Sequence, residues 1–522
     1  MIAPDTSADR SGGTPAAPAD QARLVSALCA PGALGPGAAT RLETHISYVL
    51  LTGDYAYKIK KAVNLQFLDF TTLAARRYYC REEVRLNRLL APSVYLDVVT
   101  ITGTAERPTV GGDRPVLEYA VRMRRFGRDA LLSDMLAHGA LTTGHIDQLA
   151  AEVAAFHGRT SRVSANLPWG TPDSIIDPAL QNFTQLEAEV HNAPDRDSLQ
   201  ALRRWTEREH ADCVPVFRQR HLEGFVRECH GDLHLGNIAL VDGQVTLFDR
   251  LEFNESMRWI DVMNDVAFVV MDLQELKRPD LAARFLSAYL EATGDYDGLR
   301  VLRFYLVYRS MVRAKVAHMR LTQLAADEDA EPVQRQYRAY LDLALAQSHR
   351  PPVAMIITHG LAGSGKTTCA QTVLERTGAV RIRTDVERKR LHGLQPGASS
   401  GSAVGEGLYT RAASDETYEH VCRLARTVAA SGYTVVVDGT FLRRSQRELF
   451  HRTAQSLGLP FVIVAVSAPH QTLRERIAER SRRGVDASEA TTAVLEQQLL
   501  TEEPFEPEEL PCVVQWSTGG SS

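Results

Sequence analysis

The chain has 522 residues, which is too many for one ordinary hydrophobic core and predicts roughly two to four domains. Its composition, 44% hydrophobic and 24% charged, is typical of a globular protein. Its net charge of −5 gives no overall positive electrostatic field that could by itself hold a nucleic-acid backbone. The start of the sequence lacks the basic and apolar regions of a secretory signal, and the longest apolar runs are too short for a bilayer. We therefore expect a cytoplasmic protein without a membrane partner.

Seven cysteines are spread along the sequence without a CxxC pair or another spacing typical of a metal site. Scattered cysteines of this kind are expected of reduced thiols inside a cell. We therefore predict no disulfide bond, no structural zinc and no metal other than magnesium.

The first 20 residues are mostly Ala, Pro, Gly, Ser and Asp and offer almost nothing to bury, so we expect residues 1–20 to form a disordered tail. Residues 21–125 should form a small lobe, because short β-like runs surround one helical stretch. The expected elements are two strands, one helix and two further strands, at 47–53, 55–61, 71–90, 94–103 and 115–126.

Residues 126–348 have a helical periodicity instead. The segment HIDQLAAEVAAFHGRT places four apolar residues on one stripe, namely Ile146, Leu149, Val153 and Phe156. Further helices are expected around 180–220, 260–292 and 298–346. A small mixed lobe followed by a larger helical lobe is the layout of a bilobal, protein-kinase-like α+β fold.

The helical pattern ends near Pro351 and Pro352, because two prolines cannot continue a helix, so we expect a second domain over residues 353–522. In this segment buried β-like runs alternate with helical stretches. The expected strands are VAMIITHG, AVRIRTD, TVVVDGT and FVIVAVSA. This alternation predicts an α/β domain of the P-loop NTPase type, with a parallel sheet and flanking helices.

The residues from His230 to Asn237 read HGDLHLGN, and the β-like run QVTLFD then supplies Asp249. Phosphoryl transfer needs a carboxylate for the acceptor hydroxyl, oxygen ligands for magnesium, and a lysine on the nucleotide phosphates. Asp232 and Asn237 have the kinase spacing DxxxxN, and Asp249 supplies a second hard ligand. An HxD triplet alone commonly marks a turn or a helix cap, but Asn237, Asp249 and Glu252 at these spacings favour a kinase-type phosphotransferase.

The pattern HxDxxxxN followed by Phe248-Asp249-Arg250-Leu251-Glu252 resembles the aminoglycoside phosphotransferase family. The resemblance implies that Asp232 is the catalytic base, that Asn237 and Asp249 bind Mg²⁺, and that the donor is ATP. The family also includes kinases of choline, sugars and other small alcohols. The resemblance therefore implies a small-molecule alcohol as the acceptor and does not imply an antibiotic.

By the same resemblance, the nucleotide lysine should lie on the strand YAYKIKK, where Lys58 and Lys60 share one face and Lys61 points to the other. Lys58 is the favoured candidate and Lys60 is the second candidate. The alternative for either lysine is an exposed charge on a strand, with no role in nucleotide binding. The usual partner is a helix glutamate, for which Glu83 matches better than Glu82.

A second phosphate-binding motif lies between a predicted strand and a predicted helix, which is the context that gives such a motif meaning. It consists of Gly360, Gly363, Ser364, Gly365, Lys366, Thr367 and the following Thr368. Glycines allow backbone amides to surround the β-phosphate, Lys366 reaches the β and γ oxygens, and Thr367 binds Mg²⁺. With this loop, the chain is similar to fused bacterial proteins described as bifunctional aminoglycoside phosphotransferase and ATP-binding proteins.

Downstream of the loop, Asp438 ends the run TVVVD and is expected to support Mg²⁺. The sequence Asp385-Val386-Glu387-Arg388 resembles the DxxR of polynucleotide-kinase-like P-loop kinases, in which the Asp activates the acceptor hydroxyl and the Arg holds the substrate. The alternative for Asp385 is a helix cap.

The segment LRERIAERSRRGVD is similar to the arginine-bearing lid of such kinases. Arg476 and Arg480 lie one helical turn apart, where both can face the phosphates. A solvated charged helix is the alternative.

Two further groups in the first half favour structural roles. Asp261 and Asp265 are expected to brace a helix behind the site, and His157 is expected to be a core histidine.

Three hypotheses follow. In the first, both domains are ATP- and Mg-dependent kinases, the second acting on a small molecule or a nucleic-acid end. In the second, the P-loop domain is a regulatory ATPase or nucleotide sensor. The third is a scaffold that binds nucleotide without chemistry, which the intact Asp232 and Lys366 argue against.

Overall fold

The computed structural model describes residues 18–35, 37–65, 68–113, 115–164, 166–324, 329–395, 398, 407–483 and 491–517. The expected tail lies outside these residues up to residue 17. Residues 18–20, which we expected in the tail, instead begin helix α1 (Pro18–Leu28), because proline suits the first helical turn and the apolar residues that follow are buried.

The chain divides into two compact units, each made of three segments of the chain. The first consists of Met1–His145, Phe156–Gly170 and Arg220–Asp265. The second consists of Ile146–Ala155, Thr171–Gln219 and Val266–Ser522.

A six-stranded antiparallel sheet with the order β1-β2-β3-β8-β6-β7 forms the main layer of the first unit. Its strands are β1 (Thr40–Glu43), β2 (Ser47–Thr52), β3 (Tyr55–Lys60), β6 (Tyr95–Thr104), β7 (Arg107–Val110) and β8 (Val116–Arg124). The helix α2 (Leu73–Asn87) packs against β6 and β8. The predicted order of two strands, one helix and two strands is confirmed, with β1 and β7 as additions.

The alternation of β3 explains how this sheet presents charged groups to α2. Tyr57 and Ile59 are buried in one hydrophobic cluster with Leu50. Since side chains alternate along a strand, Lys58 and Lys60 point to the opposite face, where α2 lies. The strand therefore directs two lysines toward the helix.

Short paired strands frame the HGDLHLGN loop. The strand β9 (Val226–Glu228) pairs with β12 (Trp259–Asp261), and β10 (Ile238–Val241) pairs with β11 (Gln244–Leu247). The loop itself ends in a 3₁₀ turn, Leu235–Asn237. The remaining elements of the first unit are β4 (Asn64–Leu65), β5 (Leu68–Asp69) and α3 (Leu132–Ala137). The helix α4 (Thr143–Arg159) belongs in part to each unit, because its residues Ile146–Ala155 are assigned to the second.

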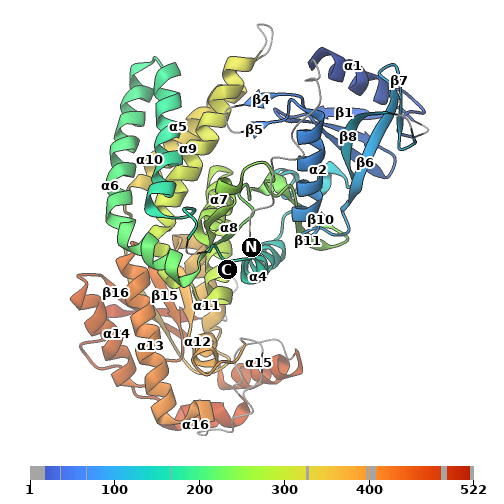
Figure 1. Cartoon of the computed structure of the whole chain (residues 1–522). Coiled ribbons are helices and arrows are strands. Elements are labelled where there is room, and N and C mark those ends of the chain that lie inside the picture. Colours follow the sequence, from blue (N-terminus) through green and yellow to red (C-terminus); the bar gives the residue numbers. More distant parts are fainter. Residues whose placement is uncertain are drawn as a thin grey trace. The chain divides into compact units, whose positions relative to one another are not determined.

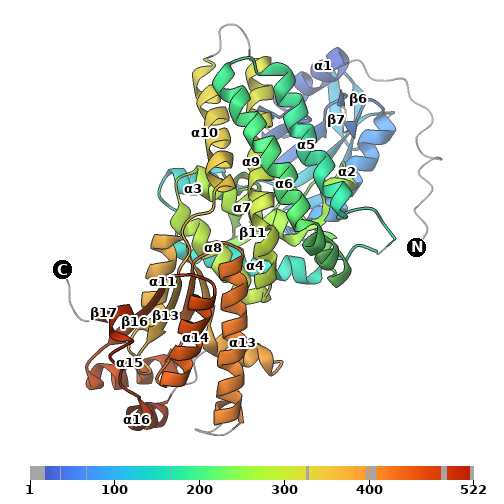
Figure 2. The ribbon, with the colours of Figure 1, turned by 90° about the vertical axis from the view of Figure 1, so that its left-hand side faces the viewer.

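The second unit begins with long helices that run side by side in Figures 1 and 2, namely α5 (Pro172–Glu189), α6 (Ala193–Glu223), α9 (Leu299–Gln323) and α10 (Glu331–Ser348). The helical stretch expected at 260–292 is divided into α7 (Val262–Glu275) and α8 (Pro279–Thr293). The division falls between Glu275 and Pro279, where Lys277 adopts a left-handed φ of +61° and Pro279 suits the first turn of α8. None of the helices in the described part of the chain combines the length and the apolar character that a membrane span needs.

The rest of the second unit is a parallel five-stranded sheet with the order β14-β15-β13-β16-β17. The strands are β13 (Met355–His359), β14 (Val380–Arg383), β15 (Val435–Asp438), β16 (Phe461–Ser467) and β17 (Val513–Ser517). The connecting helices are α11 (Lys366–Thr377), α12 (Thr384–Leu391), α13 (Arg411–Ala430), α14 (Arg444–Ser456), α15 (His470–Arg483) and α16 (Thr492–Thr501). The predicted parallel sheet is confirmed. Its carboxyl edge carries the phosphate loop after β13, together with Asp438 and Arg383, the last residues of β15 and β14.

Candidate active sites

The HGDLHLGN loop holds Asp232 and Asn237 against each other. The Nδ2 atom of Asn237 donates to the backbone oxygen of Asp232 at 2.9 Å and to its carboxylate at 3.1 Å. Because the Nδ2 atom is used in this way, Oδ1 is the atom of Asn237 that suits a cation. The Asp232 carboxylate is 43% exposed, so a substrate hydroxyl can reach it.

Asp249 is tied to the same loop through its neighbour Phe248. The backbone N–H of Phe248 donates to the Asn237 carbonyl at 3.0 Å, and the His230 ring contacts the Phe248 carbonyl at 2.9 Å. The backbone of Asp249 has φ +59°, a left-handed conformation that is uncommon outside glycine. Its N–H donates to the Tyr95 hydroxyl at 3.1 Å. The structure thus brings together the three residues Asp232, Asn237 and Asp249.

The two lysines of β3 form a buried ionic network with this group. Lys58 Nζ lies 2.9 Å from Glu83 and 2.5 Å from Asp249. Lys60 Nζ lies 2.7 Å from the other oxygen of Glu83 and also contacts Glu252. Burial opposes the charge on Glu83, but the two lysines outweigh it and lower the pKa of Glu83 to about 2. The pKa of Lys58 is raised well above its usual range, since Asp249 and Glu83 outweigh the effect of burial.

This network distinguishes the two lysines. Lys60 is fully buried between two glutamates, whereas the side chain of Lys58 is 10% exposed and touches Asp249 directly. Lys58 is therefore the better placed of the two for a nucleotide phosphate. Lys61, by contrast, pairs with Glu43 at 2.7 Å.

Two residues of this site gained a role only from the structure. Glu252 was part of the sequence motif, but its contact with Lys60 was not predicted. Tyr95 was not identified at all, because no local pattern relates a strand tyrosine to a residue 154 positions later.

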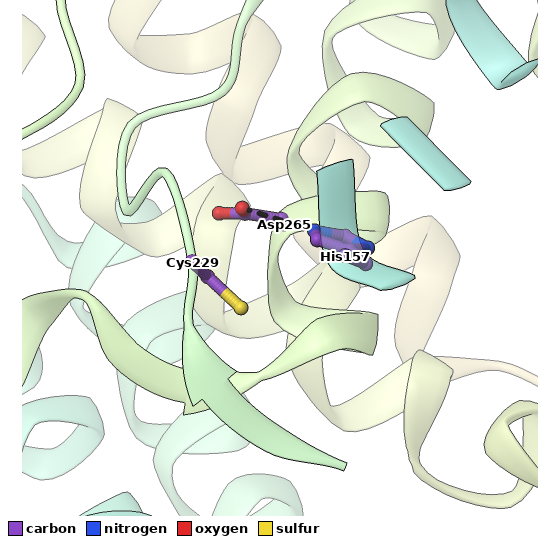
Figure 3. A group of neighbouring side chains, drawn as sticks. All are labelled: His157, Cys229 and Asp265. Atoms are coloured by element: carbon purple, nitrogen blue, oxygen red, sulfur yellow. Dashed lines mark hydrogen bonds and ion pairs between the residues drawn. The ribbon is translucent and has the colours of Figure 1, made fainter. Parts of the chain in front are cut away.

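Behind the loop, His157, Cys229 and Asp265 lie side by side (Figure 3), with one ligand atom of each within 4.8 Å of the others. Asp265 accepts from the backbone N–H groups of His230 at 2.7 Å and Gly231 at 2.9 Å, and lies 3.3 Å from the His157 ring. Burial raises the pKa of the Cys229 thiol well above its usual value, which disfavours the thiolate that a metal requires. Asp265 thus braces the HGDLHLGN loop, whereas we expected it to brace a helix.

The second motif folds as a phosphate loop between β13 and α11. Gly360 has φ +141°, and a Cβ there would lie 2.3 Å from the Val466 carbonyl. Gly363 has φ +80°, and a Cβ added at Gly363 would lie 2.9 Å from the Leu473 carbonyl. Only glycine fits both positions. Lys366 Nζ donates to the Leu361 carbonyl at 2.7 Å, so the lysine lies over its own loop.

Asp438 and Asp385 lie at the same edge of the parallel sheet. Asp438 ends β15, is 6% exposed, and is the strand partner of Arg383 in β14. Asp385 lies in the first turn of α12, but the N-cap position belongs to Arg383 and has no side-chain cap. Asp385 is therefore not the N-cap residue of α12.

The arginines expected at the second site differ in their surroundings. Arg476 Nη1 lies 3.4 Å from the carbonyls of Gly363 and Ser364, so it reaches the phosphate loop. The side chain of Arg480 lies outside the described residues. Arg388 is 7% exposed and donates to the Leu408 carbonyl at 3.1 Å and to Thr417 at 3.3 Å.

Comparison with known proteins gives two family matches. A model described as a phosphotransferase enzyme family matches residues 79–305, and a model described as an AAA domain matches residues 355–505. An uncharacterized protein of Mycobacterium tuberculosis strain H37Rv is 31% identical over 453 residues, which is 87% of this chain and 88% of that protein. An uncharacterized protein of Mycobacterium bovis matches to the same extent.

Among solved structures, a choline/ethanolamine kinase family protein from Mesorhizobium loti is 13% identical, covers 64% of this chain and 99% of its own, and has a TM-score of 0.36. A gluconokinase from Sinorhizobium meliloti 1021 is 23% identical, covers 33% of this chain and 86% of its own, and has a TM-score of 0.24.

Proposed function

Since the chain belongs to a family of proteins in which a phosphotransferase domain is followed by a P-loop AAA domain, we propose that its first site transfers the γ-phosphoryl group of ATP, bound with Mg²⁺, to a hydroxyl group of a small molecule. This membership confirms the resemblance found in the sequence. The domain limits 21–348 and 353–522 are proposed with it; both family matches lie inside them.

The observation that carries the proposal is the convergence of Lys58, Asp249, Asn237 and Asp232. We assign Asp232 as the base that orients and deprotonates the acceptor hydroxyl, and Lys58, held by Glu83, as the contact to the nucleotide phosphates. Asn237 and Asp249 are the assigned magnesium ligands. A bound Mg²⁺ neutralises charge that develops on the transferred phosphoryl group.

The charge of the site supports a cation there. Two lysines face three carboxylates, those of Glu83, Glu252 and Asp249, which leaves one net negative charge. The groups near Asp249 that can bind a metal ion are carboxylate and amide oxygens, which are the ligands that magnesium prefers.

For the P-loop domain, we propose nucleotide binding by the loop from Gly360 to Thr368, with Thr367 and Asp438 as magnesium ligands and Arg476 as a phosphate contact. Arg480 is proposed as a second contact on sequence grounds alone. Asp385 is the proposed acceptor base. Its place at the carboxyl edge of the sheet, outside the N-cap position, supports a kinase activity toward a small molecule or a nucleic-acid end.

One observation favours a second candidate, in which the P-loop domain is a regulatory ATPase or nucleotide sensor. Arg388, the residue proposed to hold the substrate, is bound by Leu408 and Thr417 of its own domain. An arginine held in this way has to be released before it binds an acceptor.

A screen of the full chain with labelled ATP tests these assignments against aminoglycosides, amino alcohols, sugars, nucleosides and oligonucleotide ends. Asp232→Asn should abolish transfer to the first acceptor class while MgATP still binds. Asp385→Asn should abolish transfer to a second class, or leave every activity unchanged if the domain is a sensor. Full transfer by Asp232→Asn would contradict the proposed function.

A further inference from the structure

A carboxylate of helix α8 reaches the second nucleotide site. Glu291 lies on α8, inside the phosphotransferase match, whereas Arg381 and Arg383 lie on β14 of the P-loop sheet. All three belong to the second compact unit. Arg381 donates to one carboxylate oxygen of Glu291 at 3.0 Å, and Arg383 donates to the other at 3.3 Å.

Arg383 is shared between this glutamate and a proposed magnesium ligand. Its Nε atom lies 3.8 Å from the Asp438 carboxylate, and the two residues are partners across parallel strands. Asp438 is 6% exposed and Glu291 is 17% exposed, so water screens these charges only partly. The guanidinium thus lies where it competes with a cation for Asp438.

The contact between α8 and the sheet is built from more than one bond. The Ser287 hydroxyl of α8 accepts from the backbone N–H of Arg381 at 3.0 Å. A cavity of about 700 Å³ adjoins the contact, and Glu291, Arg383 and Thr367, the other proposed magnesium ligand, line it together. Glu291 is therefore held in place at a cavity that Thr367 also lines.

We propose that Glu291 is a positioning residue for the second site, which draws Arg383 away from Asp438 and so allows Asp438 to bind Mg²⁺. This inference rests on the proposed magnesium role of Asp438. Without the charge of Glu291, the contact of Arg383 with Asp438 is no longer opposed, and the two arginines repel the incoming cation. The magnesium affinity of the P-loop domain then depends on a helix of the phosphotransferase half.

The test uses the full chain with Asp249→Asn, which removes a proposed first-site metal ligand, and measures the Mg²⁺ concentration that half-saturates ADP binding. In this parent, Glu291→Gln should raise the Mg²⁺ midpoint about fivefold or more, without changing ADP affinity in the absence of Mg²⁺. Glu291→Asp, which retains the negative charge, should have a Mg²⁺ midpoint close to that of the parent. Adding Arg383→Gln to Glu291→Gln should return the midpoint toward that of the parent, because the competing cation is gone.

A matched control is Glu375→Gln. Glu375 lines the same cavity but pairs with Arg284 at 2.7 Å, so its neutralisation should leave the midpoint unchanged. The inference is overturned if Glu291→Gln behaves like this control, or if the double variant remains shifted. If Asp438→Asn leaves the Mg²⁺ midpoint of the parent unchanged, the magnesium role of Asp438 fails, and the inference fails with it.

Discussion

Tyr95→Phe offers a sharp test of how the first site holds its metal ligand. The Tyr95 side chain is 1% exposed, and its hydroxyl accepts from the backbone N–H of Asp249 at 3.1 Å. Burial, and then the charge of Asp249, raise the pKa of Tyr95 well above its usual value, so the hydroxyl stays protonated. Phenylalanine fills the same space and removes only the oxygen.

The magnitude follows from what the lost oxygen does. Asp249 has φ +59°, a conformation that costs about 1–2 kcal/mol for a residue other than glycine. Removing the acceptor leaves its N–H without this bond, at a cost of about 1–3 kcal/mol. If the lost hydrogen bond destabilises the magnesium-bound state by about 1–2 kcal/mol, the rate of first-site transfer at limiting Mg²⁺ should fall about 5- to 30-fold.

The assay is the initial rate of phosphoryl transfer by the full chain as a function of Mg²⁺ concentration at saturating acceptor. Tyr95→Phe should raise the Mg²⁺ requirement and leave second-site nucleotide binding unchanged. Tyr57→Phe is the matched control, because Tyr57 is a buried tyrosine of the same sheet that packs in a different cluster. An unchanged Mg²⁺ dependence in Tyr95→Phe, or an equal shift in Tyr57→Phe, would refute the reasoning.

Three further predictions concern the lysine network and the phosphate loop. Lys58→Met should lower first-site transfer by at least about 100-fold. Lys60→Met should mainly lower the free energy of unfolding, by about 3–5 kcal/mol, because it removes the lysine that pairs with the buried carboxylate of Glu252. A rise in KM for ATP that is larger in Lys60→Met than in Lys58→Met would reverse this assignment. Because the folded pKa of Glu83 is about 2, below its ordinary 4.5, its contribution to stability is complete above that ordinary value and is lost as the pH falls toward about 2. Between about pH 5 and about pH 2, the free energy of unfolding measured with urea should therefore fall by roughly 3 kcal/mol less in Glu83→Gln than in the unaltered protein. An equal fall in both proteins would contradict this prediction. Gly360→Ala should abolish nucleotide binding at the second site, since its Cβ would lie 2.3 Å from a carbonyl, whereas Gly378→Ala, with φ +71° and nothing within 4 Å, should retain binding.

The sequence predicted elements where a run of residues favours one kind of secondary structure. The strand YAYKIKK and the helix that carries Glu83 were predicted correctly and form β3 (Tyr55–Lys60) and α2 (Leu73–Asn87). The edge strand β17 was not predicted, since all five of its residues are only partly buried or exposed and it lacks a strict alternation.

The geometry of the sites was predictable only for residues that belong to one local sequence motif. Alternation along β3 predicted that Lys58 and Lys60 share a face, but it could not distinguish them, because residues two apart are equivalent in a strand. The distinction came from Asp249, which is 191 positions away from Lys58. The contacts of Tyr95 with Asp249 and of Glu291 with Arg383 likewise join distant segments, and no local pattern encodes such pairs.

The central claim, two independent nucleotide sites on one chain, is tested most directly by the stoichiometry of a non-hydrolysable ATP analogue bound with Mg²⁺, measured by calorimetry on the full chain. We predict two bound molecules per chain, one after Asp249→Asn, one after Lys366→Ala, and none after both substitutions together. A single bound molecule in the unaltered protein, or the loss of all binding after either substitution alone, would contradict the claim.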